Sequence, residues 1–165
     1  MRRLTLLRHA QAEPARAGGA DRDRPLDRRG RGEAAEMANR LAEQQLVPDR
    51  LLISPASRTR ETTDFVLRQL ALDQTLVLPV EALYLAEAGA ILEAISRIGA
   101  LAQHLMIVAH NPGLSELAQQ LAPDVAPRDL PTAGMVTMLA DLAEWSDLAA
   151  TRMLECRYDH PAQPA

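Results

Sequence analysis

Two arginines and two histidines of this chain stand where they could bind an anion and react with it. Arg8 and His9 are adjacent at the end of "RLTLLRH". Arg58 lies in "SPASRTRETT", and His110 ends "HLMIVAH". A guanidinium binds an oxyanion through paired N–H donors, and a neutral imidazole is a nucleophile that can accept a phosphoryl group. The four residues form a phosphoryl-transfer site only if the fold brings them together.

Each of these residues ends or follows a segment with the pattern of a buried strand. Short, nearly continuous apolar runs cover residues 3–9, 50–54 and 104–110, as expected of central parallel strands. Arg58 follows the second run, at the start of a predicted helix. Ligands of such sheets bind beyond the carboxyl ends of the strands. We therefore expect the four residues to meet at one edge of the sheet, where two helices begin and favour a phosphoryl group.

The remaining periodic segments alternate between helix and strand. The predicted helices cover residues 27–45 (capped by Asp27), 57–70, 86–103 and 112–121, and the further predicted strands cover 75–80 and a hairpin of 134–142 with 151–158. This order predicts an α/β fold: a single-domain three-layer sandwich with a mostly parallel central sheet, helices on both faces and an antiparallel edge. We expect the domain to span residues 1–158 and residues 159–165 to be a disordered tail.

Composition narrows the possible partners. The chain has 165 residues, enough for one domain with a sizeable core, and 47% of them are hydrophobic although only 2% are aromatic. The net charge of −4 gives no reason to expect nucleic acid or an anionic membrane as a partner. Arginines are interleaved with acids, as in "DRDRPLDRRGRGEAAE", which is typical of a solvated loop and helix face.

The residues that several other reaction types require are missing from this sequence. The sequence has no lysine, which removes the P-loop lysine and Schiff-base chemistry. It has no HExxH, CxxC or carboxylate-rich metal loop, so we expect no metal and no cofactor. The single cysteine, Cys156, cannot form an intrachain disulfide and does not begin a C-x5-R phosphatase loop. Without an apolar run of about 20 residues, the sequence predicts a cytoplasmic protein with no membrane partner.

Each candidate residue also has an ordinary structural interpretation. His9 alone would be a strand-end residue bonded to backbone, and His110 alone would cap a loop. Arg58 alone would be a solvated helix residue, and Asn111-Pro112-Gly113 an ordinary turn into a helix. Their joint placement at predicted strand ends favours a common site.

The blocks "LLRHAQAE", "DRPLDRRGRGEA", "LLISPASRTRETT" and "VAHNPGLSEL" resemble the signature blocks of the histidine phosphatase superfamily, also called phosphoglycerate mutase-like. The resemblance is greatest to its SixA-type phosphohistidine phosphatases and spans residues 4–121. It implies that His9 is phosphorylated during turnover and that Arg8 and Arg58 clamp the phosphoryl group. It also implies that His110 is the second pocket histidine and that Asn111 offers a backbone N–H to the phosphate.

The sequence departs from the family pattern at several positions. Ala10 stands where many members have glycine, and Thr59 where alanine is usual. Larger members carry a glutamate after the third strand as acid and base, and "LPVEALYLAEAG" offers no clear equivalent. Five carboxylates lie in or near loops that could supply a hidden acid: Glu13, Asp21, Asp23, Glu81 and Glu87.

The resemblance implies a phosphohistidine phosphatase that dephosphorylates a partner protein in signalling, through a covalent phosphohistidine enzyme intermediate. The compact chain leaves little sequence for a lid over a small metabolite, which favours a site open to a protein surface. We expect a monomer. Two alternatives stay open: a small-molecule phosphatase or mutase on the same scaffold, and a non-catalytic module that binds phosphorylated partners.

Overall fold

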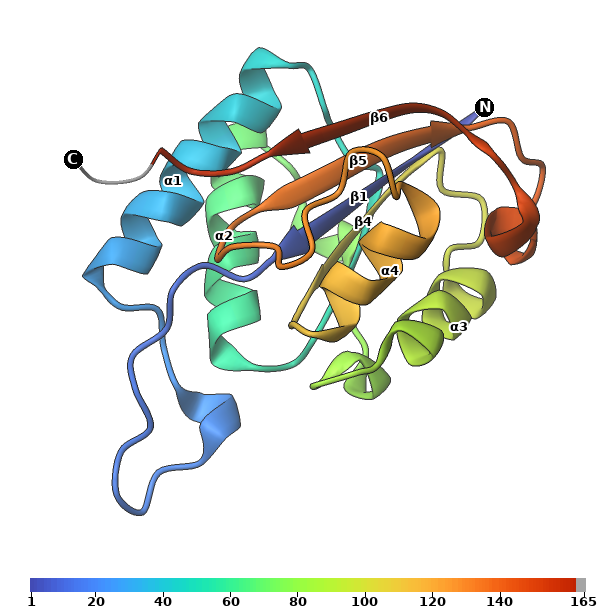
Figure 1. Ribbon diagram of the computed structural model, residues 1–165. Helices are drawn as coiled ribbons and strands as arrows, with labels where there is room; N and C mark the ends of the chain where they lie inside the picture. Colours follow the sequence, from blue (N-terminus) through green and yellow to red (C-terminus); the bar gives the residue numbers. More distant parts are fainter. Residues whose placement is uncertain (163–165) are drawn as a thin grey trace.

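A six-stranded sheet runs through the middle of the protein in the order β3-β2-β4-β1-β5-β6 (Figure 1). The computed structural model describes residues 1–162. The strands are β1 (Arg2–Arg8), β2 (Arg50–Ile53), β3 (Val77–Pro79), β4 (His104–Ala109), β5 (Met135–Ala140) and β6 (Met153–Asp159). The first four strands pair in parallel, whereas β5 runs antiparallel to β1 and β6 antiparallel to β5. The predicted mostly parallel sheet with an antiparallel edge is confirmed.

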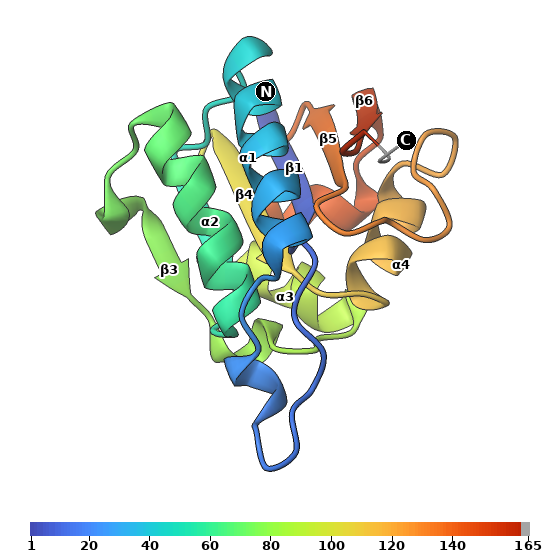
Figure 2. The ribbon, with the colours of Figure 1, turned by 90° about the vertical axis from the view of Figure 1, so that its left-hand side faces the viewer.

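Helices cover both faces of this sheet. They are α1 (Arg28–Glu43), α2 (Ser57–Leu70), α3 (Ala88–Ile98) and α4 (Gly113–Leu121), with short 3-10 turns η1 (Asp21–Asp23), η2 (Gln74–Leu76), η3 (Glu81–Leu83) and η4 (Trp145–Ala150). Figure 2 shows α1 and α2 in front of the sheet and α3 behind it. The predicted three-layer sandwich is therefore confirmed.

Alternate residues of the central strands build two separate cores. Leu4 and Leu6 of β1 pack with the buried residues of α3 and α4, whereas Leu7 packs with those of α1 and α2. In β4 every residue is buried, because helices cover both sides of it. Each fully buried aliphatic side chain stabilises the fold by about 1.5–3 kcal/mol. This double burial explains the continuous apolar runs in the sequence.

The first turn of α1 is fixed against the segment that follows His9. The Asp27 carboxylate accepts a hydrogen bond from the Gly30 N–H at 2.7 Å, which caps the helix as predicted. A Cβ atom on Gly30 would lie 1.9 Å from the Gln11 carbonyl oxygen, so only glycine allows this approach. One turn later, the buried Glu33 carboxylate accepts the Gln11 N–H at 3.0 Å. Helix α1 therefore holds the backbone just beyond the end of β1.

Two predicted elements are shorter in the structure. The helix predicted over 86–103 spans only Ala88–Ile98, because Gly99 packs where a Cβ atom would lie 2.6 Å from the Trp145 ring, and Ala100 takes a left-handed φ of 49°. The strand predicted over 75–80 spans only Val77–Pro79, because residues 74–76 form the turn η2.

The first residues of the tail predicted over 159–165 have defined contacts in the structure. Asp159 is the last residue of β6, and its carboxylate pairs with Arg40 of α1. The same guanidinium donates to the His160 carbonyl oxygen at 2.7 Å. These contacts extend the ordered edge beyond residue 158, and residues 163–165 of the predicted tail lie outside the described residues.

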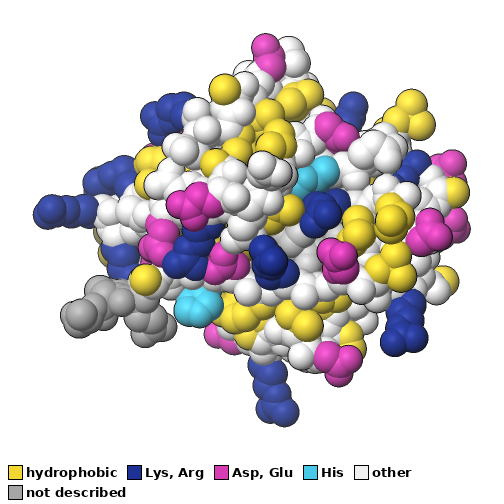
Figure 3. Space-filling view, turned by 90° about the horizontal axis from the view of Figure 1, so that it is seen from above, with side chains coloured by type: hydrophobic (Ala, Val, Ile, Leu, Met, Phe, Trp, Pro, Cys, Tyr) yellow, Lys and Arg dark blue, Asp and Glu magenta, His cyan; other side chains and the backbone are white. Residues whose placement is uncertain are grey.

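The surface carries mixed charge. In the face seen from above, Figure 3 shows arginine and acidic side chains interspersed, with apolar side chains between them. This agrees with the alternating charges of the sequence and its small net charge of −4. None of the helices in residues 1–162 has the length and apolar character needed to cross a membrane.

Three buried polar side chains form a row across strands β4, β1 and β5. The Thr5 hydroxyl lies 2.9 Å from His104 Nε2 and 3.0 Å from the Thr137 hydroxyl, which links β4, β1 and β5. Burial lowers the pKa of His104 to about 4, and the nearby Arg3 adds to the shift. His104 is therefore neutral in the folded protein at neutral pH.

This depressed pKa predicts an acid-dependent loss of stability. Between about pH 6.5 and pH 4 the unfolded chain protonates His104 but the folded protein does not, so the free energy of unfolding falls as the pH falls. The loss attributable to this one group is about 3 kcal/mol by pH 4. Urea unfolding across this range measures how steeply the free energy of unfolding changes with pH. His104→Gln should reduce this slope by the amount that corresponds to about one bound proton. An unchanged slope in that variant would contradict the assignment.

Candidate active site

The parallel pairing of β1 and β4 brings two of the predicted site residues side by side. Arg8 lies in register with Ala109, and the His9 N–H donates to the Ala109 carbonyl oxygen at 3.2 Å. His9 and His110 therefore follow the ends of neighbouring strands. Their ring centroids lie 5.3 Å apart. The two histidines, 101 positions apart in sequence, share one edge of the sheet.

The neighbouring strand β2 supplies the third element of the site. The Ser54 N–H donates to the Val108 carbonyl oxygen at 3.0 Å, which continues the pairing of β2 with β4. The chain then turns into α2, and Arg58 lies in the first turn of that helix. Arg58 is only 2% exposed, so the interpretation of a solvated helix residue is wrong.

These residues line one cavity of about 360 Å³ at the carboxyl ends of β1, β2 and β4. The residues that line it are Arg8, His9, Gln11, Ala12, Asp21, Arg24, Arg58, Leu85, His110, Asn111 and Thr132. All five residues that the sequence predicted for the site are among them. The structure thus brings the whole predicted set together.

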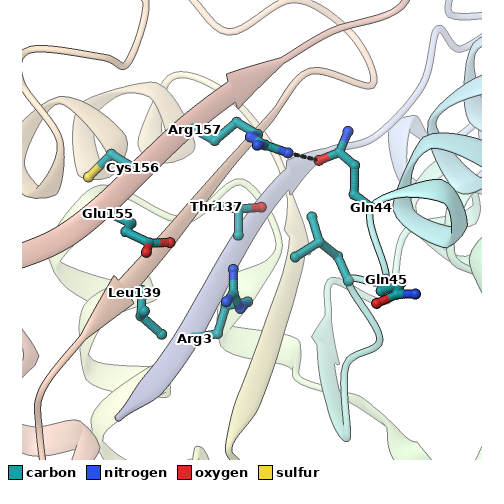
Figure 4. Close-up of a pocket in the computed structure, with 9 residues that line it drawn as sticks. Arg3, Gln44, Gln45, Thr137, Leu139, Glu155, Cys156 and Arg157 are labelled. Atoms are coloured by element: carbon teal, nitrogen blue, oxygen red, sulfur yellow. Dashed lines mark hydrogen bonds between the residues drawn. The ribbon is translucent and has the colours of Figure 1, made fainter.

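A larger hollow of about 620 Å³ lies elsewhere, near the start of β1, and is lined by β1, β5, β6 and the end of α1 (Figure 4). Figure 4 shows Arg157 donating to the Gln44 side chain across it. None of the residues that line this hollow belongs to the predicted site. We therefore place the candidate site in the smaller cavity, where the buried histidines and arginines lie.

His9 is held in one tautomer. Its Nδ1 lies 2.7 Å from the Ala10 carbonyl oxygen, which only accepts, so Nδ1 carries the proton and Nε2 keeps its lone pair. Burial lowers the pKa of His9 to about 4, and the positive charges of Arg58, Arg8 and Arg24 add to the shift. At neutral pH His9 is a neutral imidazole with Nε2 available as a nucleophile.

His110 is also neutral in the free protein. Its Nε2 lies 2.7 Å from the Ser54 hydroxyl. Burial is the main cause that lowers the pKa of His110 to about 3, and the nearby His9 and Arg58 lower it as well. His110 therefore carries no positive charge in the resting site at neutral pH. With Ser54 donating to Nε2, the neutral ring still presents Nδ1–H as a donor.

Three buried nitrogen atoms lack a hydrogen-bond partner, and all three belong to the predicted site: Arg8 Nε, Arg58 Nε and His110 Nδ1. No other buried side-chain nitrogen or oxygen in residues 1–162 is unpartnered. Leaving one such group unsatisfied costs about 1–3 kcal/mol. All three belong to residues that line the cavity with His9. The two guanidinium N–H groups, and the His110 ring in its Nδ1–H tautomer, can donate to the oxygens of a tetrahedral oxyanion.

The Asn111 side chain has a structural role. Its Nδ2 donates to Asp129 and to the Leu130 carbonyl oxygen, both at 2.9 Å, and its Oδ1 accepts the Ser115 hydroxyl at 2.7 Å. The Leu130 carbonyl also accepts Arg8 Nη1 at 2.8 Å. Asn111 thus ties the 129–130 loop to α4 and helps to orient Arg8. Its backbone N–H stays a prediction as a phosphate ligand.

Sequence reasoning missed a hydroxyl that joins the two halves of the site. Thr62 Oγ1 accepts the Ala10 N–H at 3.0 Å and donates to the Arg58 carbonyl oxygen at 2.7 Å. It couples the backbone after His9 to the helix turn that carries Arg58. The only signal in the sequence was its spacing of one helical turn after Arg58.

Of the five carboxylates considered as a hidden acid, Asp21 alone lines the cavity. A hydrogen bond from Tyr84, with others from Arg24 and Arg58, lowers the pKa of Asp21 to about 2. It is therefore ionised and cannot donate a proton at neutral pH. Two of the others face cations on the surface, Glu13 with Arg16 and Glu81 with Arg22.

The arginine and histidine side chains in the cavity are suited to an anion rather than to a metal ion. Within the described part of the chain, His, Cys, Asp and Glu side chains nowhere form a group of three or more that could hold a metal ion. Two guanidinium groups and two neutral imidazoles can instead bind a phosphoryl group and accept it on nitrogen.

Comparison with known proteins agrees with this chemistry. The model of the histidine phosphatase superfamily, branch 1, matches residues 4–81, which include Arg8, His9 and Arg58. Two Mycobacterium tuberculosis proteins of uncharacterized function, MT1313 and Rv1276c, are each 34% identical over 152 residues, 86% of this chain and 91% of theirs. An uncharacterized chloroplastic protein of Arabidopsis thaliana, At3g52155, is 44% identical over 61 residues, 37% of this chain, but the match spans only 28% of that protein.

Solved structures extend the similarity over the whole chain. A crystal structure from Agrobacterium tumefaciens, assigned as the phosphohistidine phosphatase SixA, is 27% identical with a TM-score of 0.78, over 98% of this chain and 99% of that one. A mycobacterial glucosyl-3-phosphoglycerate phosphatase, Rv2419c, shares the fold at 16% identity with a TM-score of 0.64, over 97% of this chain and 98% of that one.

The fold and the matched blocks define a phosphoryl-handling α/β enzyme. The chain belongs to the histidine phosphatase superfamily, with its similarity on the SixA side of that family. It is a hydrolase of the phosphatase class.

The site predicts a defined protonation pattern. Nitrogen NMR of the imidazole rings should show His9 neutral with its proton on Nδ1 at pH 7, and both His9 and His110 should stay neutral until the pH approaches 4 and 3 respectively. Burial disfavours the charged rings, which is the physical reason. A His9 ring that titrates near pH 6.5, or that carries its proton on Nε2, would contradict this geometry.

Proposed function

We propose that the protein removes the phosphoryl group from a phosphohistidine side chain of a partner protein, by way of a covalent phosphohistidine on His9. The observation that carries the proposal is the set of three unpartnered buried donors beside His9. They supply hydrogen bonds for the oxygens of a phosphoryl group, and His9 supplies the nucleophile.

The reaction proceeds in two displacements. In the first, the lone pair of His9 Nε2 forms a bond to phosphorus while the bond from phosphorus to the substrate nitrogen breaks, and Arg8, Arg58 and His110 hold the equatorial oxygens. In the second, a water molecule forms the new P–O bond, the bond to Nε2 breaks, and the electron pair returns to His9. Inorganic phosphate then leaves; one proton of the water stays on the new P–O–H group and the other passes to the solvent.

Among the described residues that line the cavity there is no protonated carboxylic acid, which favours a phosphoramidate substrate. An alkyl alcohol is a poor leaving group that needs a proton in the transition state. Asp21, the one candidate acid that lines the cavity, has a pKa of about 2 and is ionised. A phosphohistidine protonated on its ring leaves as neutral imidazole without a protein acid. The likeness to a SixA structure supports the same substrate class.

The proposed setting is a cytoplasmic signalling reaction in which the substrate is a phosphorylated protein domain. The single cysteine agrees with a reducing compartment. The cavity is lined by the 10–26 loop on one side and by Leu85, Asn111 and Thr132 on others, and a side chain from another protein can enter it.

The nucleophile is tested by His9→Ala. Removal of a residue that carries covalent chemistry typically lowers the rate by ~10⁴-fold or more. The variant should lose turnover of an aryl phosphate and lose the acid-labile phosphoenzyme that wild type forms in a rapid quench. His160→Gln, a histidine change outside the cavity lining, is the matched control and should leave both unchanged. Near-normal activity of His9→Ala would sink the mechanism.

The substrate class is tested by a rate ranking. Phosphohistidine peptide and aryl phosphate should exceed phosphoserine and sugar phosphates by ~10²-fold or more in kcat/KM, the size of a general-acid contribution. The measurement compares initial rates of phosphate release by wild type across the four substrates. Comparable kcat/KM on a sugar phosphate would favour a small-molecule phosphatase, and no hydrolysis of any substrate would favour a module that only binds phosphorylated partners.

A further inference from the structure

The loop of residues 10–26, which lies between β1 and α1, reaches the cavity, where one of its residues, Asp21, accepts hydrogen bonds from Arg58. Figures 1 and 2 both show this loop extending below the sheet. Arg58 Nη1 donates to the Asp21 carbonyl oxygen at 3.0 Å, and Nη2 donates to the Asp21 carboxylate at 3.1 Å. Both terminal nitrogens of the guanidinium are therefore engaged by one residue, while Nε is buried without a partner.

This arrangement fixes the direction in which Arg58 presents its free donor. A guanidinium is planar, so two bonds from its terminal nitrogens to Asp21 set both its position and its rotation. The edge that carries Nε–H has no partner in the protein, and Arg58 is one of the residues that line the cavity. A carboxylate near a phosphoryl group is otherwise unfavourable, because the two negative charges repel. Its position is explained if it orients Arg58.

Asp21 is itself held from three sides. The Tyr84 hydroxyl donates to its carboxylate, and Arg24 Nε donates to the same group at 2.9 Å. The Tyr84 ring in turn packs edge-on against His110, with centroids 5.6 Å apart. The Arg22 guanidinium lies over the Tyr84 ring, 4.6 Å from the ring centroid, and pairs with Glu81. We call the residues that hold Asp21 in this way, Arg24, Tyr84, Arg22 and Glu81, the clasp.

The charge state of Asp21 separates two possible roles. A hydrogen bond from Tyr84, with those from the two arginines, lowers its pKa to about 2. A proton donor would need a pKa near the working pH. A fixed acceptor that orients a cation needs to stay ionised, which Asp21 does.

We propose that Asp21 is a positioning residue: its main-chain carbonyl and carboxylate, held by the clasp, orient Arg58 so that Nε–H points at the phosphoryl group. This rests on the proposed function, because it assigns Arg58 to the phosphoryl group. It makes the 10–26 loop part of the anion site rather than a surface connection.

The test is Asp21→Asn, which keeps the shape of the side chain and removes its charge. A small misorientation of a positioning group costs about 100-fold in rate, so kcat/KM should fall by about that factor. The fall should be equal for aryl phosphate and phosphohistidine peptide, because Arg58 contacts the phosphoryl group that both share. Asp23→Asn, in the same 3-10 turn but outside the cavity lining, is the matched control and should behave as wild type.

A double-mutant cycle separates positioning from general stabilisation. If Asp21 acts through Arg58, Asp21→Asn should cost nothing further in an Arg58→Ala background. If Asp21→Asn fails to fold, Tyr84→Phe decides, because it removes one bond to the carboxylate and should lower kcat/KM by about tenfold. Tyr158→Phe, at the edge of the sheet, is its control. Full additivity of Asp21→Asn with Arg58→Ala, or wild-type kcat/KM in Tyr84→Phe, would overturn the proposal.

Calorimetric binding of inorganic phosphate distinguishes this proposal from the proposed function. Phosphate should bind wild type and bind Asp21→Asn at least tenfold more weakly, whether or not the protein turns over. If wild type has no phosphatase activity but phosphate still binds Asp21→Asn more weakly than wild type, the reaction is refuted and the positioning role is kept. Full activity with unchanged phosphate affinity in Asp21→Asn would refute the positioning role and keep the reaction. Absence of both activity and phosphate binding in wild type would refute the two together.

Discussion

The parallel pairing of β1 with β4 is the constraint on which the site depends. It sets Arg8 beside Ala109 and so places His9 and His110 at the same edge, 5.3 Å apart by their ring centroids. Burial of that edge keeps both rings neutral, which leaves His9 a nucleophile and His110 a donor. The same burial removes water from Arg8 Nε, Arg58 Nε and His110 Nδ1. A site with these unsatisfied donors gains free energy when an oxyanion enters.

Much of the fold could be predicted because the signals are local. Apolar runs of four to seven residues identify strands buried on both faces, and Asp27 identifies the start of α1. Parallel strands align their carboxyl ends, so placing Arg8, His9 and His110 at strand ends already placed them together. Arg58 followed from its position in the first turn of the helix after β2. The errors arose where a distant contact decided the boundary, as where Trp145 packs against Gly99 and α3 ends.

The supporting residues could not be predicted, because their contacts depend on how loops fold back. Asp21 meets Arg58 across 37 positions, Thr62 meets Ala10 across 52, and Tyr84 meets Asp21 across 63. No periodicity or short motif encodes such distances. The charge state of Asp21 is likewise a product of the fold, since it depends on the Tyr84 hydroxyl and two guanidinium groups. The sequence could name Asp21 as a carboxylate near the site, but only the structure separates an acid from an ionised acceptor.

The most direct measurement is a crystal structure of the protein with orthovanadate, which adopts the five-coordinate geometry of phosphoryl transfer. Vanadium bonded to His9 Nε2 in an axial position, with its equatorial oxygens on Arg8 Nε, Arg58 Nε and His110 Nδ1, is the predicted result. Vanadate bound away from His9, or bound in this cavity with those three donors still unpartnered, would contradict the assignment of the site.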